Sequence, residues 1–273
     1  MEFSIDSNFE LNNDTKIPIF GLGTWDMYGN EVIKSVKWAL ETGYRLIDTA
    51  SFYGNEEEIG KAIQESDIHR EDIYLTTKVW DSDQGYDRTL KSFKNSIKKL
   101  KIDYIDLYLI HWPRSYRLET WKAMENLYDN GKIRAIGVSN FTINHLKELI
   151  GSSNHIPAIN QVEFSPFLYQ KDLLEYCNDK KIRLEAYCPL TRMQKFNNSI
   201  LQEISKKYQK SPSQVLLRWG IQHGIIEIPK SSSRDHIIEN ANIFDFEIEN
   251  QDIQSLDSVN ENFRIVDDPC FYE

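Results

Sequence analysis

The chain has 273 residues, of which 40% are hydrophobic and 27% charged, and its formal net charge is -10 at pH 7. This length allows one large buried core, and the acidic balance argues against nucleic acid or an anionic membrane as the main partner. The first ten residues lack the basic and apolar regions of a secretory signal, and no apolar run reaches the ~18 residues of a spanning helix. We therefore expect a cytoplasmic protein that acts on a small molecule.

The amino-terminal residues 3–11 alternate weakly between apolar and polar, which predicts a β-hairpin that caps the floor of the fold. After them, strand and helix patterns take turns. Strands are expected near residues 19–23, 45–49, 73–79, 105–111, 133–138, 158–163, 182–188 and 225–228. Helices are expected over residues 30–42, 55–65, 88–100, 121–130, 172–180, 200–208, 214–223 and 251–259.

This alternation indicates right-handed βαβ units and a parallel sheet. Eight strands and a length near the ~250 residues typical of a (β/α)₈ TIM barrel predict one such barrel over residues 1–273, with an N-terminal hairpin and extra helices. The rival architecture, an open doubly wound sheet, needs a GxGxxG loop between a strand and a helix. The segment Gly21–Asp26 reads GLGTWD and places Asp26 where the third glycine should stand.

Reactive side chains stand at or just after several predicted strand ends, and a parallel barrel gathers these ends at one mouth. Asp48, Lys78 and His111 close three strands, and Tyr53 follows the first of them. A lysine ammonium favours a phenolate and lowers its pKa, a carboxylate keeps a buried lysine charged, and a histidine can orient a carbonyl. Taken singly, each has an ordinary explanation: an ion pair inside the barrel, a packing tyrosine, a core histidine. Their conjunction favours carbonyl reduction, with the phenol as proton donor.

Metal chemistry is not expected, because no histidine or cysteine pair has ligand spacing. The three cysteines are odd in number and form no CxxC, so we expect free thiols.

The chain resembles the aldo-keto reductase family over nearly its full length. The matching segments are GLGTW (21–25), DTASFYGNEEEIG (48–60), TTKVW (76–80), LIHWP (109–113), GVSNF (137–141), NQVEFSP (160–166), AYCPL (186–190), IPKS (228–231) and IIEN (237–240). The resemblance implies a (β/α)₈ barrel that binds NADPH and transfers its hydride directly to a carbonyl. It also implies that Tyr53 is the general acid/base, that Lys78 and Asp48 tune it, and that His111 orients the carbonyl.

The resemblance further implies a set of cofactor contacts. Ser139, Asn140 and Gln161 would meet the nicotinamide carboxamide, and Tyr187 would stack on the ring. Cys188, Pro189 and Leu190 would lie along the pyrophosphate. Around the adenosine and its 2′-phosphate would stand Lys230, Ser231, Ser232, Ser233, His236, Glu239 and Asn240. Further cofactor contacts would come from Gly23, Thr24, Trp25 and Asp48. Taken alone, the serine run could be no more than a helix cap.

Two positions depart from the family pattern. Cys188 replaces a serine and lacks its hydroxyl donor, and His236 replaces an arginine that clamps the 2′-phosphate. A neutral imidazole cannot reproduce a bidentate guanidinium, although Arg234 is close in sequence. We therefore expect NADPH preference with some use of NADH.

The substrate pocket is expected to be aromatic, with Trp25, Trp80 and Trp112 beside Tyr53 and His111. The short segment after Asn260 predicts an open mouth, which suits small aldehydes, dicarbonyls or keto sugars. Alternatives are a prostaglandin- or steroid-type ketone reductase, the same site working as an alcohol dehydrogenase, a barrel enzyme of other chemistry such as a phosphate-ester lyase, or a non-catalytic nicotinamide-binding regulatory or structural protein. The sequence favours a monomer.

Overall fold

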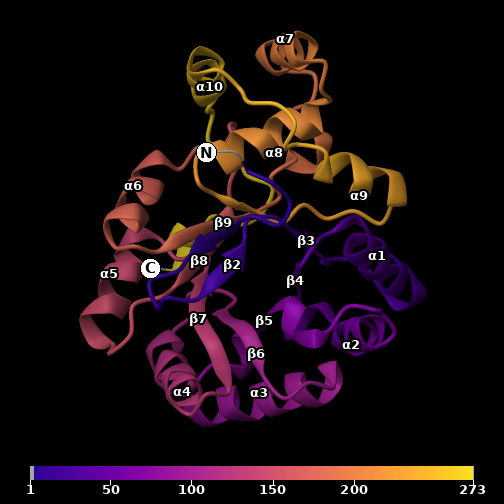
Figure 1. Cartoon of the computed structure of the whole chain (residues 1–273). Helices are drawn as coiled ribbons and strands as arrows, with labels where there is room; N and C mark the ends of the chain where they lie inside the picture. Colours follow the sequence, from indigo (N-terminus) through magenta and orange to yellow (C-terminus); the bar gives the residue numbers. More distant parts are fainter. Residues whose placement is uncertain (1–2, 273) are drawn as a thin grey trace.

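A computed structural model describes residues 3–272 as a parallel eight-stranded sheet surrounded by helices (Figure 1). The barrel strands are β3 (Gly21–Gly23), β4 (Leu46–Asp48), β5 (Tyr74–Val79), β6 (Ile105–Ile110), β7 (Ile133–Ser139), β8 (Ile159–Glu163), β9 (Arg183–Tyr187) and β10 (Ile226–Glu227). They pair in chain order, and two parallel bridges, Phe20 with Glu227 and Gly23 with Lys230, join the two ends of the sheet. The prediction of a TIM barrel is confirmed.

The α-helices are α1 (Gly29–Thr42), α2 (Glu56–Gln64), α3 (Tyr86–Leu100), α4 (Arg117–Asp129), α5 (Ile143–Ser152), α6 (Lys171–Asp179), α7 (Ser199–Tyr208), α8 (Pro212–Gln222), α9 (Arg234–Ala241) and α10 (Asn250–Asp257). Helices α1 to α6 follow the strands around the outside in chain order, and α9 lies beside α1, whereas α10 packs against α7 (Figure 1). The predicted helices are all present, and α4 begins four residues before its predicted start at Trp121. Two helices, α7 and α8, stand between β9 and β10, so one is additional to the repeat.

The amino-terminal hairpin is real, but its predicted position was wrong. Strands β1 (Asn8–Glu10) and β2 (Lys16–Pro18) pair antiparallel, so the hairpin spans residues 8–18 rather than 3–11. The reversal falls near Asp14, which has a left-handed φ of 62°, a conformation that aspartate tolerates. As expected, the hairpin covers the barrel floor, because Leu11 and Ile17 pack into the same core cluster as the interior residue Leu46.

Side chains alternate between the barrel interior and the helical layer along each strand. In β5, Leu75 packs among outer core residues, so Tyr74, Thr76 and Lys78 face the interior. A Cβ atom at Gly23 would stand 2.7 Å from the Ile228 carbonyl oxygen, so glycine permits the close approach at the barrel seam. None of the helices within residues 3–272 combines the length and apolar character that a membrane crossing requires.

Candidate active site

Asp48, Lys78 and Tyr53 meet at the carboxyl-terminal mouth of the barrel. The Lys78 ammonium donates hydrogen bonds to both carboxylate oxygens of Asp48, at 2.7 and 2.8 Å, and to the Tyr53 hydroxyl at 3.3 Å. Asp48 and Lys78 are both buried. A buried ammonium is stable only with such a counter-ion, so the three groups form one electrostatic unit.

The loops after β3 and β4 hold this unit in place. Tyr53 ends a short 3₁₀ helix, Ser51–Tyr53, and the Ser51 hydroxyl donates to the Lys78 carbonyl at 2.9 Å. Asn55 is fully buried, donates to the Thr24 and Met27 carbonyls at 2.9 and 3.0 Å, and accepts from the Thr49 hydroxyl. Sequence reasoning missed this clamping role of Asn55, since an asparagine before a helix usually signals only a cap.

The direction of the Tyr53 pKa differs from the sequence-based expectation. Burial raises the pKa of Tyr53 well above its usual value, and the Asp48 charge adds to this rise. Lys78 does not reverse the shift, because its charge is already compensated by the bidentate contact with Asp48. Tyr53 is therefore a protonated phenol at neutral pH, which is the form that can donate a proton.

His111 lies across the mouth from Tyr53, with the two ring centres 5.6 Å apart. Burial lowers the pKa of His111 well below 6.5, and the Lys78 charge lowers it further, so the imidazole is neutral. Its Nδ1 atom is buried and has no hydrogen-bond partner within residues 3–272. A neutral imidazole can donate from one nitrogen to a carbonyl oxygen.

The residues expected around the nicotinamide form a connected hydrogen-bond network. The Tyr187 hydroxyl donates to Asn140 Oδ1 at 2.7 Å, and Asn140 Nδ2 donates to the His111 carbonyl at 3.0 Å and to Ser139 Oγ at 3.2 Å. Gln161 Nε2 donates to Asp48 Oδ2 at 2.8 Å. The structure thus brings Ser139, Asn140, Gln161 and Tyr187 to the same mouth as the catalytic candidates.

The segment from Gly23 to Trp25 lies beside Lys230 at the barrel seam. Thr24 is fully buried and its hydroxyl donates to the Asp48 carbonyl at 2.8 Å, so it braces the loop. Cys188, which Pro189 and Leu190 follow, has a left-handed φ of 51°. Burial raises the pKa of its thiol to about 11, which keeps it a neutral, weak donor.

The residues expected around the 2′-phosphate stand at the start of α9. Lys230 and Ser232 are exposed, Ser231 is buried, and Ser233 caps the helix by accepting from the His236 amide at 3.5 Å. Glu239 is half-buried and Asn240 is buried in the same helix. His236 is exposed, while Arg234 reaches Glu41 of α1 at 3.6 Å.

Aromatic rings form a row along one side of the mouth. Phe52 stacks between Trp25 and Trp80, with ring centres 5.7 and 3.7 Å away, and Trp80 meets His111 at 5.0 Å. Phe52 was absent from the sequence prediction, because one phenylalanine beside a tyrosine carries no positional signal. Trp112 has a different neighbour: its ring contacts Tyr272, 5.6 Å away.

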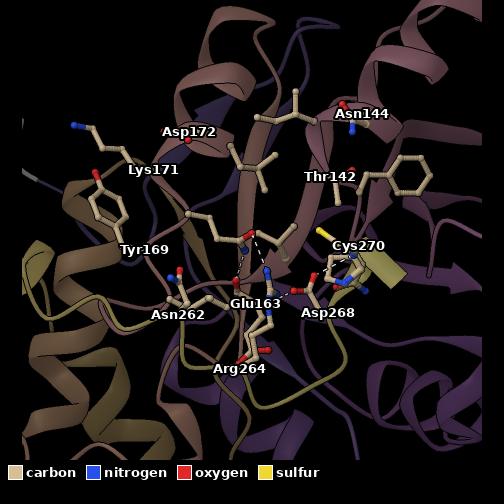
Figure 2. A pocket seen from close by; sticks show the side chains of 18 of the residues that line it. Thr142, Asn144, Glu163, Tyr169, Lys171, Asp172, Asn262, Arg264, Asp268 and Cys270 are labelled. Atoms are coloured by element: carbon tan, nitrogen blue, oxygen red, sulfur yellow. Dashed lines mark hydrogen bonds and ion pairs between the residues drawn. The ribbon is translucent and has the colours of Figure 1, made fainter. Parts of the chain in front are cut away.

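The carboxyl-terminal segment lies over the ends of β7 and β8, although its brevity predicted an open mouth. Glu163 accepts from the Ile265 and Val266 amides at 2.6 and 3.2 Å, and Arg264 and Asp268 lie close by (Figure 2). This segment borders a cavity of about 650 Å³ that reaches Asn140 but none of Tyr53, His111 or the three tryptophans. Within the described residues, no cluster of three or more histidine, cysteine or acidic side chains could hold a metal ion.

Two known proteins are similar to this chain over nearly its full length. The chain is 48% identical over 271 residues to glyoxal reductase of Bacillus subtilis, with 98% of each chain covered. It is 47% identical to 9,11-endoperoxide prostaglandin H2 reductase of Trypanosoma cruzi over 264 residues, covering 95% of this chain and 93% of that protein.

Solved structures of aldo-keto reductases are also similar to this chain. An aldo-keto reductase enzyme from a Medee basin deep-sea metagenome library superposes with a TM-score of 0.93 at 45% identity, covering 96% of this chain and 97% of the other. A Bombyx mori aldo-keto reductase in complex with NADP superposes with a TM-score of 0.90 at 35% identity, covering 96% and 95%. Residues 19–261 match the Aldo/keto reductase family, to which this chain therefore belongs.

Proposed function

We propose that this protein reduces small aldehydes and dicarbonyls to alcohols with NADPH, and that Tyr53 supplies the proton. The observation that carries the proposal is the 3.3 Å contact between the Lys78 ammonium and the Tyr53 hydroxyl, opposite the neutral His111. When bound, NADPH supplies the hydride for the carbonyl carbon. His111 orients the carbonyl by donating to its oxygen, and Tyr53 protonates that oxygen. Lys78 stabilises the phenolate that remains.

The residues of the chain fit such a cofactor. Lys230, the serine hydroxyls and the first turn of α9 combine positive charge with hydrogen-bond donors, which a phosphate ester requires. The half-buried ring of Tyr187 at the rim offers a flat surface to an aromatic ring. The B. mori relative was solved with NADP. His236 in place of an arginine supports a weaker preference for NADPH over NADH.

The aromatic row favours a small substrate. Phe52 stacks between Trp25 and Trp80, and its ring centre lies 6.4 Å from that of His111, so this bulky ring limits the space beside His111. The likeness to a glyoxal reductase agrees with this substrate class. The likeness to a prostaglandin H2 reductase, at almost the same identity, supports a bulkier substrate as the second candidate.

To test this, the protein is mixed with NADPH and with glyoxal, methylglyoxal or larger aldehydes, and the absorbance of the nicotinamide is measured over time. Tyr53→Phe should slow reduction by roughly 10²–10⁴ while cofactor binding persists. Tyr108→Phe is the matched control, because this buried tyrosine of β6 faces away from the barrel interior, among outer core residues. Full activity in Tyr53→Phe, or no turnover of any carbonyl by the unaltered protein, would defeat the proposal.

A further inference from the structure

Glu185 is a buried acidic residue inside the barrel that the proposed reaction does not use. On β9, Leu184 and Ala186 pack into the outer core, so Glu185 faces the interior. Its side chain has no solvent exposure, and among residues 3–272 neither carboxyl oxygen has a hydrogen bond of good geometry, although the Gln161 amide approaches it. A buried polar group without partners is costly and rarely persists without a role.

The groups that surround Glu185 belong to the candidate active site. Tyr74 and Lys78 of β5 point into the same interior. The charges of Asp48 and Lys78 act on Glu185, and a charge on Glu185 acts on Tyr53 and Tyr74. From β8, Gln161 stands beside Glu185 in register. The interior residues Leu109 of β6, Ala135 of β7 and Ile226 of β10 are apolar, as is Ile228 just after β10.

This environment determines how Glu185 ionises. Burial raises its pKa to about 8, the Asp48 charge raises it, and the Lys78 charge and the Gln161 amide oppose the rise. The neutral acid form of Glu185 is therefore favoured at neutral pH, beside the hydrogen-bonded pair of Lys78 and Asp48. Ionisation of Glu185 would place a second carboxylate, besides that of Asp48, near the single ammonium of Lys78 in a region that solvent does not reach.

Gln161 links Glu185 to the ion pair. Its Nε2 atom donates to Asp48 Oδ2 at 2.8 Å, and Asp48 in turn accepts from Lys78. A charge on Glu185 would compete for the Gln161 amide and for Lys78. Lys78 would then stabilise less well the phenolate that forms as the Tyr53 O–H bond breaks and the new substrate O–H bond forms.

We propose that Glu185 is a positioning residue of this site: its neutral acid leaves Lys78 to Asp48 and Tyr53, and its carboxylate slows proton donation by Tyr53. The inference rests on the proposed carbonyl reduction. Glu185 does not touch the substrate and acts through Gln161, Asp48 and Lys78.

The experiment is the pH profile of kcat for methylglyoxal reduction with NADPH, from about pH 6 to 9.5, a range that spans the protonation of such an acid. In the unaltered protein kcat should fall by about tenfold per pH unit above an inflection, as expected for loss of one proton. Glu185→Gln keeps the shape without the charge and should remove this inflection, with kcat near pH 6 within about threefold of the original. Glu185→Met is a second uncharged variant and should also remove the inflection. Glu185→Asp restores an acid and should restore an inflection.

Glu227→Gln is the matched control. Glu227 on β10 is equally buried, but it faces α8, where a Cβ at Gly220 would collide with its Oε1 atom. This change should leave the kcat inflection in place. A second readout needs no activity: the melting temperature of Glu185→Gln should exceed that of the unaltered protein by a margin that grows from about pH 5 to pH 8, because the folded pKa lies above the unfolded one.

The outcomes separate the two proposals. An active enzyme whose Glu185→Gln profile keeps the original inflection, or loses rate equally at every pH, overturns the role of Glu185 and leaves carbonyl reduction standing. A protein that reduces no carbonyl overturns both. Loss of the inflection in both uncharged variants, with Glu227→Gln unchanged, supports the inference.

Discussion

The Lys78 ammonium lies 3.3 Å from the Tyr53 hydroxyl but 2.7 Å from the Asp48 carboxylate, so the phenol shares a cation that is already paired. This pairing affects the stability of the folded protein. Removal of one partner leaves the other charge buried and uncompensated, whereas removal of both does not.

Asp48→Asn or Lys78→Met should therefore each lower the free energy of unfolding by about 3–5 kcal/mol. The double variant should recover most of this loss, although it should remain inactive without the lysine. Urea denaturation of the four proteins gives the coupling energy. Lys37→Met, which breaks the exposed 2.6 Å pair with Glu65, is the control and should cost less than about 1 kcal/mol. Additive losses in the double variant would contradict the expectation.

His111 should make stability depend on pH. Its folded pKa lies well below the ordinary 6.5 because it is buried beside Lys78. As the pH falls below about 6.5, the unfolded chain binds a proton that the folded protein does not, so stability falls by about 1.4 kcal/mol per pH unit from this group. His111→Asn should remove this part of the slope between about pH 6.5 and 5, measured by denaturation at each pH. The exposed His69 is the control, and an unchanged slope in His111→Asn would contradict the prediction.

Much of the fold could be predicted because strands and helices differ in the spacing of their apolar residues and alternate along the chain. The eight strands were predicted from apolar runs, and the positions of their ends indicated which side chains lie at the same mouth of the barrel. The hairpin was misplaced because its second strand, Lys16–Pro18, has three residues, too few for a clear alternation. The sequence patterns gave no bounds for helices α5 and α9.

The candidate site was only partly accessible from sequence. That Asp48, Tyr53 and Lys78 meet follows from topology. That Phe52 stacks between two tryptophans and that Tyr272 reaches Trp112 depends on how loops fold over the mouth, which no local pattern encodes. The upward pKa shift of Tyr53 depends on burial and on the nearby Asp48 charge, and both are properties of the packed structure.

Cofactor preference should respond to position 236. His236 is exposed on the first turn of α9, near Lys230. His236→Arg adds a charged, bidentate donor and should tighten NADPH binding by about tenfold, which corresponds to about 1.4 kcal/mol, with NADH binding unchanged. Lys230→Met should weaken the binding of NADPH but not that of NADH. Dissociation constants from fluorescence titration measure both, and equal changes for the two cofactors would show that neither residue meets the 2′-phosphate.

Phe52 should control the width of the substrate pocket. It is 47% exposed and stacks on Trp25 and Trp80, so its removal opens a gap in the aromatic row at little cost to the core. Phe52→Ala should raise kcat/KM for bulky aryl aldehydes relative to methylglyoxal by about tenfold, since an aromatic contact or clash is worth on the order of 1 kcal/mol. Tyr116→Ala is the control, because Tyr116 is similarly exposed, at 54%, but packs against Arg88, away from the row. If Phe52→Ala lowered kcat/KM for all carbonyls by one common factor, Phe52 would support Tyr53 and His111 without selecting among substrates. The ratio between two substrates is the deciding quantity, because it cancels any general loss of active protein.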